Sequence, residues 1–171
     1  MLVRRQPPQQ GSGFGGKVAA QVALKDLLDA MEFQSDETSG YLHRPTGRVV
    51  SVSADAIRAA EADDDGLVDP AELAEARDIL TNGGDYLHLP DRFEVDGYRM
   101  MERFAAGLAD PSAQGELLGS LRGRGAFRRF KDAAHRLGLA DEWYAYRDSE
   151  YEELARAWCE VHGIPLEPAS G

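Results

Sequence analysis

The sequence of 171 residues contains a single cysteine, Cys159, and lacks any long apolar run. One cysteine excludes an internal disulfide and any metal site built from several cysteines. The shortness of the apolar runs excludes a membrane-spanning helix. Arg4 and Arg5 are followed by QPPQQGSG and not by an apolar stretch, so we expect no export signal and a cytoplasmic protein.

Positive charge is also scarce, since 19 Lys and Arg face 30 Asp and Glu and the formal net charge is -11. This balance argues against non-specific nucleic-acid binding by the whole surface, although it leaves room for a local basic patch. The hydrophobic content of 43% is ordinary for a globular protein, and the length suits one domain. We expect a disordered tail over 1–17, a single domain over 18–166 and a C-terminal tail over 167–171.

The first half of the chain carries the patterns of helices alternating with short strands. Apolar residues recur at helical spacing over 20–33, and GYLHRPTGRVVSVS predicts a hairpin with strands over 41–44 and 48–52. Ser53 then suits the N-cap of a short helix. A third strand is expected over 85–90.

A longer helix is predicted to start after Asp69. Pro70 suits the first helical position, and Glu72 completes an Asp-x-x-Glu capping pattern. The residues that we expect on the buried face of this helix are Leu73, Ala76 and Leu80.

The second half of the chain is nearly all helical. Helices are expected after Asp96 and Asp110, over 126–137 and over 149–162. DEWYAYRD, residues 141–148, is predicted to be an aromatic cluster between the last two helices. These patterns together predict an α+β fold, in which a small antiparallel sheet (a hairpin plus one strand) is packed by about six helices.

Within this acidic chain, the segment LRGRGAFRRFK holds five cations and two aromatic rings. From Phe127 onward, apolar residues recur at helical spacing, at Phe127, Phe130, Ala134 and Leu137. This spacing predicts that both rings are core residues and not stacking platforms for bases. Asp132 lies four residues from both Arg128 and Arg136, so we expect ion pairs along the helix to neutralise part of its positive charge.

The same segment also allows a second interpretation, an anion site. Two glycines can turn backbone amides outward at the start of a helix, and two arginines flank them. The residues that we expect to contact an anionic partner are Arg122, Gly123, Arg124, Gly125, Arg128, Arg129 and Lys131. The sequence leaves both interpretations open.

Several segments resemble one protein family. GRGAFRRFKD, EWY and ARAWCEVHGI, together with GYLHRPTGRVVSV and RMMERFAAGL, are similar to the uncharacterised bacterial protein family one hundred and fifty-eight of the UPF series. The resemblance covers roughly residues 22–164 and is most distinctive over 123–132. It implies a bacterial cytosolic protein, and it supplies no catalytic residues because the family has no established activity.

The acidic segment EADDDGLVDPAE, residues 61–72, resembles the calcium loop of an EF-hand. The matching positions are Asp63, Asp65, Gly66, Asp69 and Glu72. The first position holds Glu61 where a shorter Asp is usual, the last two matches are explained by helix capping, and no second loop is present. Calcium is therefore an alternative that these features disfavour.

A zinc site would require four scattered residues to meet: His43, His88, Cys159 and His162. A buried structural cysteine is the simpler expectation, and we predict no metal or cofactor.

No serine elbow, P-loop or cysteine–histidine signature for nucleophilic catalysis occurs in the sequence. An enzyme is therefore our third hypothesis. The first is a non-enzymatic interaction or regulatory domain that contacts an unknown protein partner, and not a membrane, through the Arg122–Lys131 segment. The alternative is nucleic-acid binding by the same segment.

Overall fold

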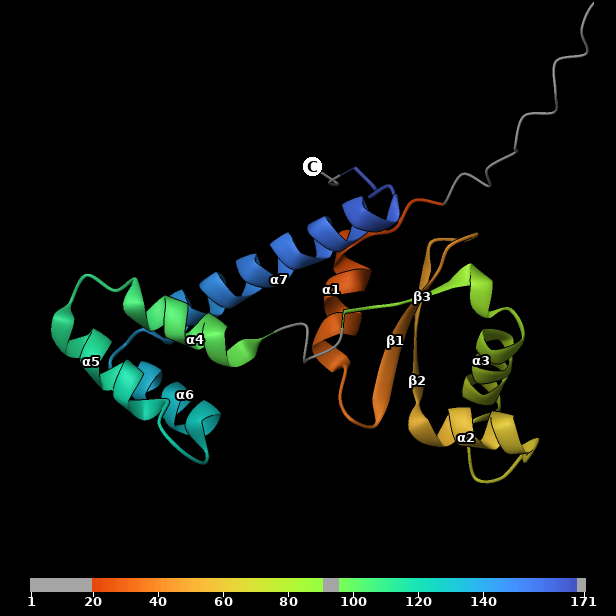
Figure 1. Cartoon of the computed structure of the whole chain (residues 1–171), viewed down its shortest axis with the longest axis horizontal. Helices are drawn as coiled ribbons and strands as arrows, with labels where there is room; N and C mark the ends of the chain where they lie inside the picture. The colour runs from red at the N-terminus through yellow and green to blue at the C-terminus, as the bar shows by residue number, and fades with distance from the viewer. Residues whose placement is uncertain (1–19, 91–95, 169–171) are drawn as a thin grey trace, which may run out of the picture.

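The computed structural model describes residues 20–90 and 96–168, so the tail expected over 1–17 lies outside the described part. Within that part, seven α-helices and a three-stranded antiparallel sheet confirm the predicted α+β fold (Figure 1). None of these helices is long and apolar enough to cross a membrane. The elements in chain order are α1 (Leu24–Phe33), β1 (Thr38–His43), β2 (Arg48–Ser53), α2 (Ala54–Ala62), α3 (Pro70–Thr81), η1 (Gly83–Asp85), β3 (Tyr86–His88), α4 (Gly97–Ala106), α5 (Pro111–Ser120), α6 (Ala126–Arg136) and α7 (Ala140–His162).

The sheet has the strand order β2-β1-β3, and both pairings are antiparallel. The hairpin places His43 of β1 opposite Arg48 of β2, next to the turn. At the other edge of β1, Tyr86 of β3 pairs with His43. The hairpin and the third strand are thus confirmed, and β3 is shorter than expected because it ends at His88.

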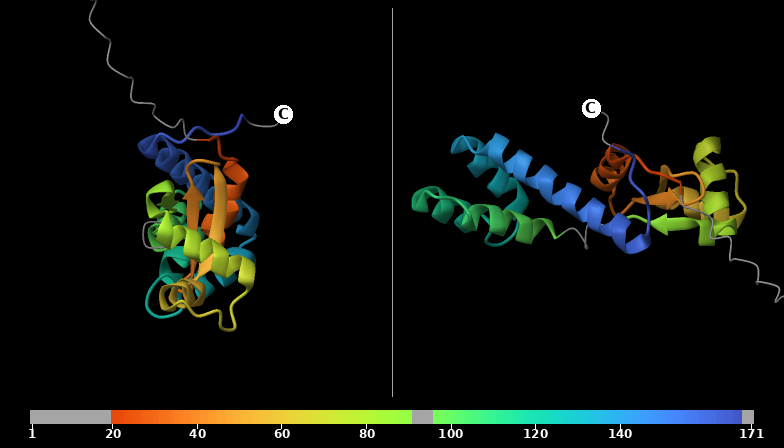
Figure 2. Two further views of the ribbon diagram at one scale, coloured as in Figure 1. Left: turned by 90° about the vertical axis from the view of Figure 1, so that its right-hand side faces the viewer. Right: turned by 90° about the horizontal axis from the view of Figure 1, so that it is seen from above.

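Side chains alternate between the two faces of the sheet, and different helices cover each face (Figure 2). Leu42 and Leu89 join the large apolar core that also includes the buried sides of α1, α4, α5, α6 and α7. Val52, Ile79 and Tyr86 form a smaller cluster on the opposite face, where α3 packs. Helix α1 lies between the sheet and α7, so it joins the helical half of the molecule to the sheet half.

The starts of α2 and α3 follow the capping rules. The Ser53 hydroxyl accepts a hydrogen bond from the Ala56 N–H at 3.1 Å. The Asp69 carboxylate accepts from the N–H groups of Ala71 and Glu72 at 2.9 and 3.1 Å. Each side chain satisfies amides that lack partners within the first turn of the helix, so both predicted starts are confirmed.

Two details of α3 differ from the prediction. Glu72 does not complete a cap within its own helix; its Oε1 accepts from the Ser53 N–H at 2.6 Å and ties α3 to the end of β2. Leu80 is exposed and not buried. The buried residues of α3 are Leu73, Ala76 and Ile79. Because these residues are spaced three positions apart, the buried side of the helix faces away from Leu80.

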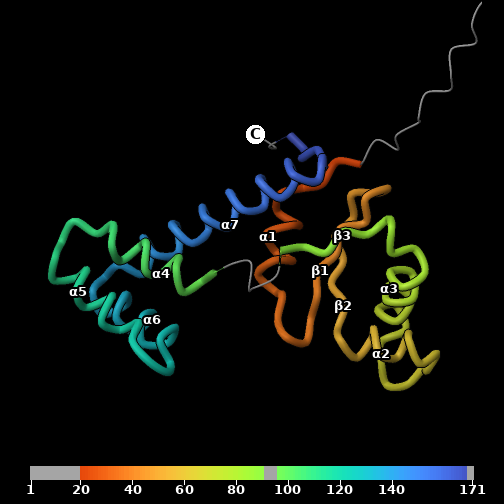
Figure 3. Tube along the Cα trace, viewed as in Figure 1, coloured from red at the N-terminus to blue at the C-terminus, as the bar shows by residue number. Residues whose placement is uncertain are grey.

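The last helix is longer than predicted. Helix α7 runs without a break from Ala140 to His162, so 141–148 form its first turns and not a connection (Figure 3). Trp143 is buried between Phe104 and Phe130, with ring centroids 5.4 and 4.9 Å away. The stretch contains neither Gly nor Pro, and packing of its aromatic residues on α4 and α6 keeps it helical.

The prediction that Phe127 is buried is wrong. Phe130 is completely buried, whereas 52% of Phe127 is exposed. The buried face of α6 consists of Ala126, Phe130, Ala133 and Ala134. Because Ala126 begins this buried face, Phe127 lies at the edge of the face. Its ring there contacts Gly97 at the start of α4.

We predict that Phe130→Ala lowers the free energy of unfolding by about 3–5 kcal/mol, because it removes a ring that fills the core. Phe127→Ala should lower it by less than about 1 kcal/mol, since half of that ring is already in water. Urea denaturation of both variants measures the difference. Equal losses of stability would contradict the placement of the two rings on α6.

Candidate functional site

The predicted anion site lies at the turn between α5 and α6. Gly123 and Gly125 adopt φ angles of 78° and 73°, in the left-handed region that glycine enters without strain. The two glycines let the chain reverse and start α6 at Ala126. The N-cap residue, Gly125, offers no side-chain acceptor to the first amides of α6. We call residues 122–131 the basic corner.

Arg129 binds the turn from within. Its Nε donates to the carbonyl of Ser120 at 3.1 Å and its Nη2 to that of Gly123 at 3.3 Å. Further bonds from the same guanidinium reach the carbonyls of Arg122 and Arg124. Because a guanidinium carries five donors in one plane, it can serve several carbonyls that helix α5 and the turn leave without partners. Arg129 therefore holds the shape of the basic corner.

The other cations of the basic corner are mostly unpaired. Of the Lys and Arg residues that the structure describes, all but five form ion pairs with Asp or Glu. Four of these five lie in the basic corner: Arg122, Arg124, Arg129 and Lys131. The fifth, Arg44, lies in the hairpin turn. The basic corner thus holds most of the positive charge that acids leave free in the described residues.

The ion pairs around the basic corner are few and exposed. Arg128 lies 3.9 Å from Asp132, and both side chains are largely in water. Arg136, which the sequence also paired with Asp132, instead binds Glu116 of α5. Exposed pairs of this kind contribute only tenths of a kcal/mol, so Arg128 remains available to a stronger partner.

An exposed aromatic patch adjoins these cations. The Phe127 ring lies one turn before Lys131 on the same side of α6 and covers Gly97. Tyr98, the next residue of α4, is also exposed. The sequence had placed the Phe127 ring in the core, so the structure adds an apolar contact to a site expected to be purely polar.

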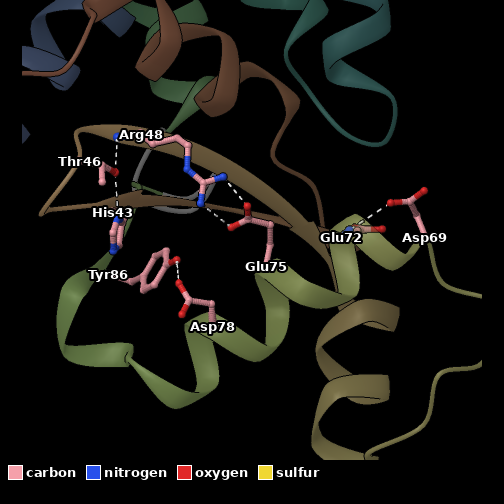
Figure 4. A network of polar contacts seen from close by, with 8 residues as sticks. All are labelled: His43, Thr46, Arg48, Asp69, Glu72, Glu75, Asp78 and Tyr86. Carbon is pink, nitrogen blue, oxygen red and sulfur yellow. Dashed lines mark hydrogen bonds and ion pairs between the residues drawn. The ribbon is translucent and has the colours of Figure 1, made fainter.

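A second polar cluster, on the sheet face that α3 covers, was not expected from the sequence (Figure 4). The Tyr86 hydroxyl donates to Asp78, which also accepts from Asn82 Nδ2 at 2.7 Å. The His43 ring packs against Tyr86 with ring centroids 4.7 Å apart and a tilt of 40°, and its Nδ1 lies 2.7 Å from the Thr46 hydroxyl. His43, Tyr86 and Asp78 come from β1, β3 and α3, which the fold of the sheet brings together.

The chemistry of this cluster is that of a structural link. Burial, with the hydrogen bond to Asp78, raises the pKa of Tyr86 to about 12, so its phenol stays protonated at neutral pH. The hydrogen bonds from Tyr86 and Asn82 lower the pKa of Asp78, which remains a carboxylate. Nearby, Arg48 and Glu75 join β2 to α3 through two hydrogen bonds, the second of 2.9 Å. General acid–base catalysis needs groups whose pKa values lie near neutral pH. The pKa of Tyr86 lies far above neutrality and that of Asp78 lies below it, so neither group is suited to this role.

A cavity of about 250 Å³ lies between α1 and α7. Its charged side chains already have partners, because Arg147 Nη2 lies 3.2 Å from Glu32 and 3.0 Å from Asp148, and Asp29 pairs with Lys25. Burial raises the pKa of Tyr151 in the same wall. The cavity is smaller than typical ligand sites of roughly 300–1,000 Å³. We therefore assign it no ligand.

The loop that resembles an EF-hand uses its acids on the protein itself. Arg77 lies 3.3 Å from Asp63 and 2.7 Å from Asp65, Asp69 caps α3, and Glu72 binds the Ser53 amide. In the described part of the chain, no three His, Cys, Asp or Glu side chains are placed to hold a metal ion. That calcium leaves this loop unchanged stays a prediction.

The four residues considered for zinc divide between two parts of the molecule, because His43 and His88 lie on the sheet and Cys159 and His162 lie on α7. His88 meets Tyr41 edge to face on the sheet. Cys159 is buried on α7, where burial raises the pKa of its thiol, and His162 stacks on Trp158. The rings that contact His88 and His162 are aromatic, and the buried thiol of Cys159 lies in the apolar core.

With its sheet, helices and basic corner described, the chain can be assigned to a family. The model of the uncharacterised protein family UPF0158 matches residues 20–166, and the chain belongs to that family. Comparisons with curated proteins and with solved structures find no match. The resemblance seen in the sequence is thus confirmed.

We predict that Arg129→Gln lowers the free energy of unfolding by about 1–2 kcal/mol, because hydrogen bonds from a charged donor to four carbonyls are lost. Arg128→Gln, on the next residue, should change it by less than about 0.5 kcal/mol. Chemical denaturation of the two variants makes the comparison. Similar stabilities would mean that Arg129 does not hold the turn.

A second prediction concerns Tyr86. Its folded-state pKa is raised from 10.0 to about 12, so its contribution to stability is complete below pH 10 and is lost as the pH rises toward 12. Tyr86→Phe should lack this pH-dependent part and cost about 1 kcal/mol at neutral pH. Urea denaturation of both proteins from about pH 9 to pH 12 tests it, and parallel pH profiles would contradict it.

Proposed function

We propose that the protein is a non-enzymatic interaction domain whose basic corner binds a carboxylate-bearing segment of a partner protein. The observation that carries this proposal is the gathering of unpaired cations around an exposed ring. Arg122, Arg124 and Lys131 have no acidic partner among the described residues, in a chain whose net charge is -11. Acids elsewhere in the molecule outnumber bases, so a corner left unpaired is unusual for this protein.

Charge is distributed unevenly along the chain. Residues 97–139 hold eight Lys and Arg against four Asp and Glu, although acids predominate in the whole sequence. Arginine favours carboxylates because its planar fork can form two parallel hydrogen bonds with them. The pair Arg122 and Arg124, separated by one glycine, thus suits an acidic segment with closely spaced carboxylates.

The shape of the basic corner supports binding without a large ordering cost. Arg129 holds the carbonyls of the turn through hydrogen bonds, and Gly123 and Gly125 allow its left-handed path. A surface that is already ordered loses less conformational freedom when a partner docks. The exposed Phe127 ring can then cover an apolar side chain of the same segment.

Nucleic-acid binding is the second candidate, and the exposure of Phe127 favours it. A ring between cations on a surface can stack with a base while the cations contact phosphates. The acidic remainder of the molecule opposes a long polyanion, which extends beyond the basic corner. We therefore place a protein partner first.

The test uses Arg124→Gln, with Arg44→Gln as the matched control because Arg44 is unpaired but lies outside the basic corner. Both variants should keep the stability of the wild type. Fluorescence anisotropy with a labelled oligoglutamate peptide should give at least about tenfold weaker binding for Arg124→Gln only, since a charge-assisted contact is lost.

Two outcomes would count against the proposal. If Arg124→Gln unfolds at markedly lower urea concentration and the peptide binds both variants alike, the arginine is structural. If a labelled single-stranded oligonucleotide binds more tightly than the peptide, with a steep loss of affinity on raising salt, the partner is nucleic acid. Mass spectrometry and sequencing of molecules that co-purify with the native protein provide the independent check.

A further inference from the structure

The most exposed large apolar side chain of the described residues lies far from the basic corner. Leu67 is fully exposed in the loop between α2 and α3. We call residues 63–69, with the sequence DDDGLVD, the acidic loop. A leucine without cover, surrounded by four aspartates, combines an apolar contact with negative charge.

The acidic loop is held in shape by its own contacts. Asp64 Oδ1 accepts from the Gly66 N–H at 3.0 Å, and Arg77 ties Asp63 and Asp65 to α3. Both of these carboxylates remain more than four-fifths exposed. Leu67 is therefore presented by a formed loop whose charges still face water.

The basic corner has the complementary composition. Phe127 is its exposed apolar residue, and Arg122, Arg124 and Lys131 are its unpaired cations. We propose that the acidic loop of one copy docks on the basic corner of a second copy, with Leu67 against Phe127 and the aspartates against the arginines. This inference rests on the function proposed above and names a second copy of this chain as the partner.

The two surfaces lie toward opposite ends of the long axis of the molecule, at α2–α3 and at α5–α6 (Figure 1). The view from above in Figure 2 shows the same separation. They therefore cannot meet within one chain. A contact between unlike surfaces is head to tail, and each added copy leaves one free acidic loop and one free basic corner, so assemblies grow with concentration.

The contact is small, and each copy is acidic, so the association is weak. An interface of one loop and one turn lies at the low end of the size range for specific complexes, where transient contacts are found. We expect a Kd on the order of 100 μM or above. At physiological salt, charges are screened beyond about 8 Å. Screening therefore weakens the repulsion between distant acidic surfaces of the two copies more than the attraction between charges at the contact. The test must therefore reach millimolar protein.

Complementation between two variants tests the proposal. The corner variant carries Arg124→Gln and Phe127→Ser, and the loop variant carries Asp64→Asn and Leu67→Ser. Sedimentation equilibrium of the wild type should show the weight-average mass rising about twofold when the concentration equals the Kd. Each variant alone should stay at the monomer mass. An equimolar mixture should form dimers and nothing larger, because only one intact loop and one intact corner can pair.

The control variant Arg44→Gln should associate like the wild type. The proposal is overturned if the wild type remains monomeric at millimolar concentration, if the loop variant associates as well as the wild type, or if the mixture forms no dimer. In any of these cases the function proposed above stands as long as oligoglutamate binding depends on Arg124. If oligoglutamate binding does not depend on Arg124 either, both the self-association and the proposed function are wrong. A wild-type monomer that binds a single-stranded oligonucleotide at the basic corner more tightly than oligoglutamate, with a steep loss of affinity on raising salt, overturns both in favour of nucleic acid.

Discussion

The contact of Phe130 with Trp143 is the interaction on which the arrangement of the helical half depends. Phe130 is completely buried, and its ring meets the indole edge to face at 4.9 Å. The indole also meets Phe104, so one cluster joins α4, α6 and α7. It fixes the rotation of α6 about its axis. With Phe130 inward, helical geometry leaves Phe127 at the edge and Lys131 in solvent, so core packing determines what the basic corner exposes.

Arg129 gives the same corner its shape. An arginine whose donors all faced solvent would add charge to a flexible turn, whereas this guanidinium binds carbonyls of α5 and of the turn. It leaves Arg122 and Arg124 to project from a fixed backbone. One cation of the segment thus supports the fold, Arg128 pairs with Asp132, and Arg122, Arg124 and Lys131 have no acidic partner among the described residues. A basic segment can support the fold and still present a binding surface.

Local signals in the sequence predicted the fold class, the hairpin, and the helix starts at Ser53 and Asp69, because caps and turns act over a few residues. The errors concern long-range contacts. The exposure of Phe127 depends on how α6 rotates against α7, and the continuity of α7 depends on its aromatic contacts. The cluster around Tyr86 draws residues from three elements, and only the alignment of β1 with β3 could have suggested its stacking on His43. Periodicity gives the faces of a helix, but tertiary packing decides which face is buried.

The charge pattern also bears on which partner the proposed function allows at the basic corner. A polyanion several nucleotides long would extend past residues 97–139 onto a surface where acids predominate, and the repulsion would grow with its length. A short acidic segment with one apolar side chain avoids that repulsion, because its charges end where the basic corner ends. Screening over about 8 Å makes the immediate neighbourhood more important than the net charge of -11. Under the proposed function, the excess of acids favours a compact anionic partner over an extended one.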